Sequence, residues 1–192
     1  MTEKINNAIE FMKQWHKNDF RKDGVTPYWT HPLDVFNLLK KCDKDNELDE
    51  TYYIVALLHD VLEDTKCSEE EIAKEFGTNV AYLVNCISFY EDKNNPFAKA
   101  GYLANIANIT THQTTTVVFT VKIADRICNV KDFIKNGDYR YAKTYFHKAD
   151  ILFDSLYKNI NIGMIHQSVN SKLLDEVMGL YNQFHKNKKD KL

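Results

Sequence analysis

The chain contains little of the material from which tight turns are built. Only six of its 192 residues are glycine and three are proline, whereas an all-β fold needs many glycine- and proline-rich turns. Apolar residues instead recur at helical spacing along most of the sequence. These features predict an all-α fold, and the length is most economically accommodated by one domain, which we expect to span residues 1–185.

Helical patterns are clearest in the first half of the chain. Ala8, Phe11, Met12 and Trp15 lie on one face of a first predicted helix. A loop with two of the three prolines follows, and His31 is expected where this loop meets the next helix. Further helices are predicted at 32–41, at 50–63, after the capping box Ser68 to Glu71 and up to Gly77, at 80–89, from Pro96, and at least twice within 138–185.

One segment has a composition that conflicts with a helical fold. Residues 114–124, TTTVVFTVKIA, are so rich in β-branched side chains that propensity alone favours a strand. No second strong strand signal exists to pair with it, and an isolated strand is not stable. We therefore expect the later part of this segment to form a buried helix and leave open whether 114–124 is helical throughout. We expect the lysine-rich tail 186–192 to be frayed.

Composition excludes several classes of protein. No apolar stretch is long enough to cross a bilayer, and the N-terminus lacks the pattern of a secretory signal. The four cysteines are scattered without a CxxC pair, so we expect reduced thiols and a cytoplasmic location. A net charge of −2 argues against a nucleic-acid partner, although a local basic patch would suffice for a small phosphorylated ligand.

The stretch ALLHDVLEDT, residues 56–65, gathers His59, Asp60, Glu63 and Asp64 within six positions. On one continuous helix these side chains oppose an apolar stripe, and three carboxylates would repel one another unless a positive charge lies among them. They also crowd the C-terminal end of the predicted helix, against the preference of the helix dipole. A metal ion is the simplest explanation, and a solvated acidic face is the alternative.

Two residues elsewhere are candidates to complete such a site. His31 precedes a proline at the start of a helix, and Asp125 lies in VKIADRICN. With His59 and Asp60 they form a nitrogen and oxygen donor set suited to manganese, iron or zinc. Taken singly, His31 also fits a capping residue, and Asp125 also fits a salt bridge with its neighbouring arginine.

Three blocks in order, RKDGVTPYWTHPLDV (21–35), ALLHDVLEDT followed by EEIAKEFG (56–77) and VKIADRICNVKD (121–132), resemble the HD-domain phosphohydrolases. The resemblance is to the branch with the hydrolase domain of RelA/SpoT-type alarmone enzymes and the small metazoan SpoT homologue, and it covers about three quarters of the chain. It implies an HD-domain helical bundle that holds a metal, usually manganese, through His31, His59, Asp60 and Asp125. Glu63 and Asp64 match a pair that would orient or deprotonate water and assist the leaving group.

The same resemblance implies contacts with a nucleotide. Arg21 and Lys22 match a basic pair beside the base, Asn129 matches a residue near the base and ribose, and Tyr145 resembles a tyrosine of the nucleotide pocket. The alternatives are an exposed loop pair for the two cations and a core position for the tyrosine. Lys122, one turn before an arginine, either contacts phosphate or pairs with a carboxylate.

A departure from the family lies in residues 85–113, where the family carries a basic stretch and this chain has only Lys93 and Lys99. The sequence therefore constrains the identity of the substrate less than it constrains the type of reaction. We expect removal of the 3′-pyrophosphate from guanosine tetra- or pentaphosphate, with oligomeric state open. The alternatives are another nucleotide phosphatase, acting on a deoxynucleotide, the 2′-phosphate of NADPH or an adenine alarmone, and a non-catalytic nucleotide-binding module.

The remaining histidines are expected to be packing or surface residues. They are His16, His112, His147, His166 and His185.

Overall fold

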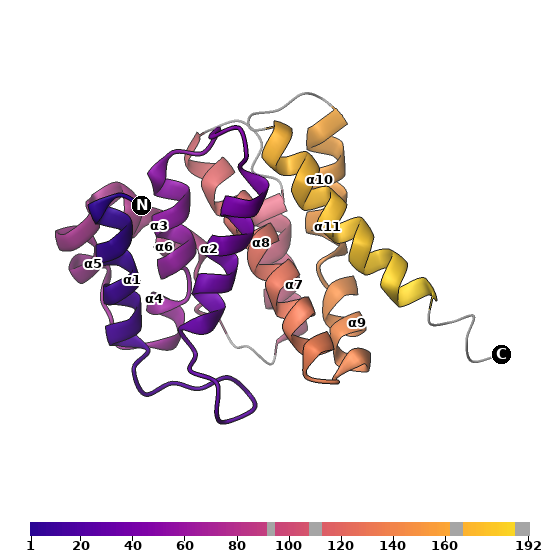
Figure 1. The fold of residues 1–192 in the computed structure, drawn as a ribbon, viewed down its shortest axis with the longest axis horizontal. Coiled ribbons are helices and arrows are strands. Elements are labelled where there is room, and N and C mark those ends of the chain that lie inside the picture. The colour runs from indigo at the N-terminus through magenta and orange to yellow at the C-terminus, as the bar shows by residue number, and fades with distance from the viewer. Residues whose placement is uncertain (92–94, 108–112, 162–166, 187–192) are drawn as a thin grey trace.

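The computed structural model describes residues 1–91, 95–107, 113–161 and 167–186, and every regular element within these ranges is a helix (Figure 1). Extended pairing in these ranges is limited to one isolated bridge between Phe20 and Pro27. The all-α prediction is therefore confirmed. The helices of the first half are α1 (Glu3–Trp15), α2 (Thr30–Cys42), α3 (Glu50–Leu58), α4 (Val61–Asp64), α5 (Glu69–Phe76) and α6 (Thr78–Ile87).

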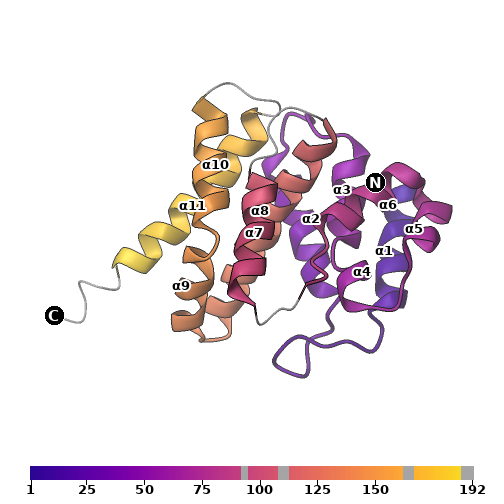
Figure 2. The ribbon, with the colours of Figure 1, turned by 180° about the vertical axis from the view of Figure 1, so that it is seen from behind.

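The second half of the chain continues the bundle. Its helices are α7 (Pro96–Ala107), α8 (Gln113–Lys135), α9 (Tyr139–His147), α10 (Asp150–Asn161) and α11 (Gln167–Lys186). Figure 1 and its reverse view in Figure 2 place α8 between the group formed by α1 to α6 and the group formed by α9 to α11. Because α8 contacts α2, α3, α6, α7, α9 and α11, its residues face both halves of the molecule.

The whole β-branched segment 114–124 lies within α8, so the helix predicted for its later part is confirmed, and it includes the earlier part as well. Its side chains at Val117, Val118, Val121 and Ile123 are almost completely buried in the main hydrophobic core. Burial on several sides stabilises these residues by far more than their small intrinsic preference for extended chain. Tertiary packing therefore decides the conformation of this segment.

The prediction of one continuous helix from 50 to 63 is wrong. The helix α3 ends at Leu58, His59 and Asp60 form a turn, and α4 occupies Val61–Asp64. The expected apolar stripe opposite a polar face is also wrong for α3, since every residue from Tyr52 to Leu58 is buried. The reason is that α1, α2, α6 and α8 surround this helix, so it is covered on all sides.

Local end signals behave as predicted around α5. Ser68 accepts a hydrogen bond from the Glu71 backbone N–H, and the Glu71 carboxylate accepts one from the Ser68 N–H, which completes the capping box. Gly77 ends α5 and begins α6 with a φ of +91°, a conformation open to glycine and strained for other residues. Pro96 begins α7 as expected, whereas α6 ends at Ile87, two residues before the predicted end.

The segment after Asp138 forms three helices, where at least two were predicted. Lys186 is the last residue of α11, and the rest of the tail predicted to fray, 187–192, lies outside the described residues. In the part of the chain that the structure describes, no helix has both the length and the apolar character needed for a membrane crossing. The four cysteines are free thiols.

The loop from 16 to 29 projects from the bundle between α1 and α2 (Figure 1). Its two arms are joined by backbone hydrogen bonds from the Tyr28 N–H to the Asp19 carbonyl and from the Arg21 N–H to the Thr26 carbonyl, each at 2.8 Å. Asp23 closes its tip by accepting from the backbone N–H groups of Val25 and Thr26. These hydrogen bonds hold the loop in a defined conformation, so it can position the side chains that it carries.

Candidate metal centre and its cavity

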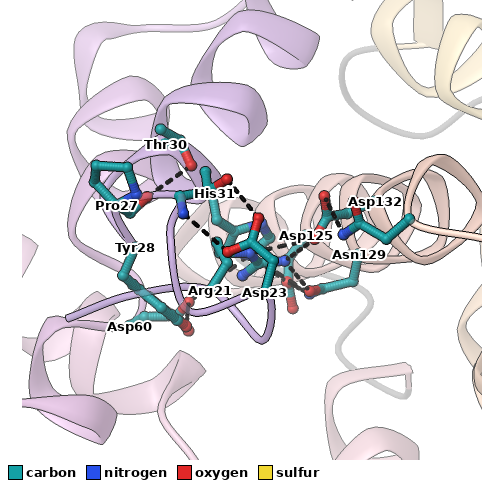
Figure 3. Close-up of polar contacts among 12 residues, drawn as sticks. Arg21, Asp23, Pro27, Tyr28, Thr30, His31, Asp60, Asp125, Asn129 and Asp132 are labelled. Carbon is teal, nitrogen blue, oxygen red and sulfur yellow. Dashed lines mark hydrogen bonds and ion pairs between the residues drawn. The ribbon is translucent and has the colours of Figure 1, made fainter.

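Four predicted metal ligands from three separate segments converge at one point. His31 comes from the first turn of α2, His59 and Asp60 from the turn after α3, and Asp125 from the middle of α8. His31 Nε2 lies 3.2 Å from Asp125 Oδ1 and 3.7 Å from Asp60 Oδ2. His59 Nε2 lies 3.1 Å from Asp60 Oδ2 and 3.8 Å from Asp125 Oδ1. Figure 3 labels His31, Asp60 and Asp125 in this region of the structure.

The geometry of this group fits a bound cation. The Nδ1–H of His59 donates to the Ala56 carbonyl at 2.7 Å, which fixes the ring with Nε2 directed toward the carboxylates. That Nε2 is buried and makes no hydrogen bond with any described residue. His31, His59 and Asp125 each offer one donor atom within 4.8 Å of the others. Asp60 is not a member of that three-residue set, but its Oδ2 atom lies 3.7 Å from His31 Nε2 and 3.1 Å from His59 Nε2.

Electrostatics at this point favour an added positive charge. Burial opposes protonation of His59, but the carboxylates of Asp60 and Asp125 outweigh it and raise the pKa of His59 to about 9. Burial would raise the pKa of Asp60 and of Asp125, yet the neighbouring positive groups, chiefly His59 for the former and Lys122 for the latter, lower both. Two buried carboxylates therefore remain ionised at one place, where a divalent cation is the natural counter-charge.

Asp125 is held by two neighbours on its own helix. Lys122 Nζ lies 3.0 Å from Asp125 Oδ2, and the Asn129 side-chain amide donates to Oδ1. Of the two interpretations of Lys122, pairing with a carboxylate is the one found, although this lysine also lines the cavity beside the centre. The two contacts fix the carboxylate so that Oδ1 faces the histidines.

Glu63 and Asp64 lie one turn beyond the histidine and aspartate pair, at the end of α4. Glu63 Oε2 accepts a hydrogen bond from the Phe89 backbone N–H at 3.0 Å. Asp64 Oδ2 accepts one from the Tyr28 hydroxyl at 2.8 Å. Both carboxylates line a cavity of about 620 Å³, as do Asp60 and Asp125, so their oxygens are available to a molecule bound there.

One face of α8 forms a wall of this cavity. The positions that line it recur at intervals of three and four residues, which is the spacing of one helical face. They are Lys122, Asp125, Arg126, Asn129, Asp132, Phe133 and Asn136. His31 and His59, at 3% and 1% exposure, lie beneath the cavity surface.

The five predicted substrate residues all line this cavity. The Arg21 guanidinium donates to Asp132 Oδ2 at 2.8 Å and to Asn129 Oδ1 at 3.3 Å, so it is tied to α8 (Figure 3). Lys22 Nζ lies 4.7 Å from the ring centre of Phe133 and is exposed. Both cations therefore line the cavity, and the exposed-pair alternative holds only for Lys22, because the Arg21 side chain is 12% exposed.

Tyr145 combines its two predicted settings. Its ring packs against the hydrophobic core and also lines the cavity. The Arg126 guanidinium carbon lies 4.6 Å from the centre of this ring, a cation–π contact. Burial raises the pKa of Tyr145 to about 12, so its hydroxyl keeps its proton.

Sequence reasoning missed Tyr28. Its hydroxyl lies 2.8 Å from Asp60 Oδ2 and 2.8 Å from Asp64 Oδ2, between a candidate ligand and a candidate catalytic carboxylate. Tyr28 stands three residues before His31 within a block that carries the family resemblance. The position of Tyr28 close to His31 in the sequence was the one signal that could have identified it as a site residue.

The other histidines lie outside the centre where they are described. His16 is buried against the Tyr28 ring and pairs with Asp19 at 3.0 Å, and His147 is partly exposed near Asp150. Both fit the predicted packing and surface roles. Predictions for His112 and His166, and for the side chain of His185, fall outside the described residues, as does Lys93.

Residues 8–153 match the HD domain family. The match covers well over half of the chain and includes every candidate ligand. This chain therefore belongs to the HD domain family.

Several curated relatives carry names from alarmone metabolism. The chain is 32% identical over 145 residues to the guanosine-3′,5′-bis(diphosphate) 3′-pyrophosphohydrolase of Borreliella burgdorferi, covering 72% of this chain and 21% of that one. The protein of the same name from Aquifex aeolicus is 36% identical, covering 67% and 18%. The GTP pyrophosphokinase rsh of Brucella melitensis biotype 1 is 33% identical, covering 66% and 16%. The chain thus spans about a fifth of the length of these relatives.

A solved structure supports the fold over nearly the whole chain. It is that of a metazoan ortholog of SpoT described as hydrolysing ppGpp, and it aligns with a TM-score of 0.69 at 23% identity. The alignment covers 94% of this chain and 97% of that one. The fold of the small metazoan hydrolase is therefore shared.

Proposed function

We propose that this protein is a metal-dependent phosphohydrolase that removes the 3′-pyrophosphate from guanosine tetra- or pentaphosphate. The products are GDP or GTP and pyrophosphate. The observation that carries the proposal is the convergence of His31, His59, Asp60 and Asp125 beside a nucleotide-sized cavity. The names of the relatives, which concern the same alarmones, support the choice of substrate.

In this proposal the four converging residues hold manganese. A divalent cation held by these residues would polarise a phosphoryl oxygen and would lower the pKa of water toward neutrality. The mixed imidazole and carboxylate donor set is compatible with manganese as well as iron and zinc. We further propose that residues 1–185 act as one domain in the cytoplasm.

The remaining polar residues are assigned by their positions. Glu63, held through the Phe89 N–H, orients the attacking water and takes its proton. Water adds to the phosphorus bonded to the ribose 3′-oxygen, the bond to that oxygen breaks, and the oxygen receives a proton by way of Asp64. Tyr28, which contacts both Asp60 and Asp64, positions these two carboxylates relative to each other.

Residues at the far end of α8 would hold the nucleoside. Arg21 and Asn129 are hydrogen-bonded to each other at 3.3 Å and present polar edges to the cavity. Lys22 Nζ lies beside the paired rings of Phe133 and Tyr141, 4.7 and 4.3 Å from their centres. Flat rings beside cations suit a purine base, and Tyr145 lies deeper along the same wall.

The test separates metal binding from turnover. Asp60→Ala or His59→Ala should abolish both guanosine tetraphosphate hydrolysis and manganese binding, measured by chromatography of products and by calorimetry. Glu63→Gln should abolish hydrolysis while manganese still binds. An Asp60→Ala protein with the parental hydrolysis rate would contradict the metal role.

A second candidate function is hydrolysis of another nucleotide phosphate at the same site. It is favoured by the middle segment, in which Lys99 is the one described cation that lines the cavity. A panel of deoxynucleotides, NADPH and adenine alarmones, incubated with the protein and manganese, decides between the two. Release of orthophosphate instead of pyrophosphate would exclude the leading proposal.

A further inference from the structure

Three cationic side chains gather at one end of the cavity. Lys99 comes from α7, while Lys122 and Arg126 lie one turn apart on α8, and all three line the cavity. Lys122 and Arg126 are 3% exposed. Three positive charges within a largely buried wall repel one another unless anions lie between them.

The ring of Tyr102 holds two of these cations together. Lys99 Nζ lies 5.0 Å from the centre of this ring and Lys122 Nζ lies 5.6 Å from it. The Tyr102 hydroxyl donates to the Ile87 carbonyl, which fixes the ring at the end of α6. Lys99 also lies 4.0 Å from the ring centre of Phe89, so its ammonium group is held at a defined place.

The three cations differ in how their charge is balanced. Lys122 pairs with Asp125 at 3.0 Å. Among the described residues, Lys99 makes aromatic contacts and no ion pair, and Arg126 has a buried Nε without a hydrogen-bond partner. Burial together with the charges of Lys122 and Arg126 lowers the pKa of Lys99 to about 8. The cluster therefore has a surplus of positive charge.

The cluster borders the reaction centre on two sides. Lys122 contacts Asp125, a candidate metal ligand. The backbone N–H of Phe89 donates to Glu63, and the Phe89 ring contacts Lys99. The opposite end of the cavity, at Phe133, is eleven residues further along α8, or roughly 16 Å along the helix axis. An anion at the cluster thus lies next to the reacting phosphorus and away from the proposed base site.

We propose that Lys99, with Lys122 and Arg126, binds the terminal phosphoryl group of the 3′-pyrophosphate and so selects pyrophosphate esters over monophosphate esters. This inference rests on the proposed hydrolase function and adds the specificity of its leaving group. A 3′-monophosphate lacks the outer phosphoryl group that Lys99 would hold while the reacting phosphorus lies at the metal centre. Lys99 is the specificity-determining member because it makes no ion pair with a described residue, whereas Lys122 is already paired with Asp125.

The experiment compares two substrates that differ only in the outer phosphoryl group. Guanosine 5′-diphosphate 3′-diphosphate and guanosine 5′-diphosphate 3′-monophosphate are hydrolysed by the parental protein and by Lys99→Met, which keeps the apolar stem. Loss of a hydrogen bond to a charged group should lower kcat/KM for the diphosphate on the order of 10- to 100-fold. The monophosphate should change less than about threefold, and Lys99→Arg should restore most of the preference. The matched control is Lys158→Met, at an exposed lysine of α10 outside the cavity.

Equal losses on both substrates, or no loss on either, would overturn the inference. Binding of inorganic pyrophosphate to the manganese-loaded protein, measured by calorimetry, tests it without turnover. The parental protein should bind pyrophosphate at least about tenfold more tightly than Lys99→Met, and equal affinities would also overturn it. If the parental protein hydrolyses neither substrate but shows this affinity difference, the proposed activity fails while the anion site stands.

Discussion

The hydroxyl of Tyr28 lies 2.8 Å from the Oδ2 atom of Asp60, although the two residues belong to different segments of the chain. The same hydroxyl lies 2.8 Å from Asp64. One group therefore fixes a candidate metal ligand and a candidate catalytic carboxylate in a set relationship. Outer partners of this kind commonly change metal affinity or activity by about 10- to 100-fold when removed.

Tyr28→Phe should lower kcat by about 10- to 100-fold and weaken manganese binding, because Asp60 and Asp64 lose their common hydrogen-bond partner. Steady-state kinetics and metal titration measure the two effects. The matched control is Tyr157→Phe, at a tyrosine of α10 that is 59% exposed and should leave both quantities unchanged. Parental kinetics in Tyr28→Phe would refute the positioning role.

Arg21→Met and Asp132→Asn should each raise KM, because the 2.8 Å ion pair between these residues holds the loop against α8. The pair is partly exposed, so its coupling should be modest, about 1 kcal/mol or less. A double-mutant cycle on KM measures it. Strict additivity of the two changes would show that the ion pair does not position the loop.

The activity should depend on pH through Lys99. Burial and the charges of Lys122 and Arg126 lower its pKa to about 8, and these outweigh the opposing effect of Glu63 and Asp125. Raising the pH through 8 therefore removes its charge, so kcat/KM for the pyrophosphate ester should fall, since this quantity reports the free enzyme. In Lys99→Arg the charge persists, and this fall should disappear. Identical pH profiles in the two proteins would contradict the prediction.

Lys99 should also make the stability of the protein depend on pH, but stability should rise where kcat/KM falls. Because its pKa is lower in the folded protein than the ordinary 10.5, the unfolded chain binds more protons between pH 8 and 10.5. Its contribution to the free energy of unfolding should therefore rise with pH over that range.

Gly77→Ala should lower the free energy of unfolding by roughly 1 to 3 kcal/mol, because φ is +91° and ψ is 158° there, a region that is nearly glycine-only. A Cβ atom at this position would meet no heavy atom within 4 Å, so the cost is conformational rather than steric. Gly179→Ala, within α11 and equally free of contacts, should instead stabilise by about 0.5 to 1 kcal/mol. Denaturant unfolding measures both, and equal effects of the two substitutions would contradict this explanation.

Several elements could be predicted from local sequence because their signals act over a few residues. The capping box at Ser68, the glycine at Gly77 and the proline at Pro96 each mark a helix end through backbone geometry alone. The helix in the later part of 114–124 was predictable only from the lack of a strand partner, and its extension over the earlier part was left open. The break after Leu58 was not predictable, since His59 and Asp60 carry no helix-ending residue type.

The sequence by itself determined the helical class and the identity of the converging residues, because donor atoms and apolar periodicity are properties of the residue types. His31, His59, Asp60 and Asp125 could be selected as a set before their distances were known. Only the tertiary structure decided that Tyr28 joins two carboxylates and that Lys99 meets the cations of α8. Those contacts depend on how segments far apart in the chain pack against one another, and no local pattern encodes that packing.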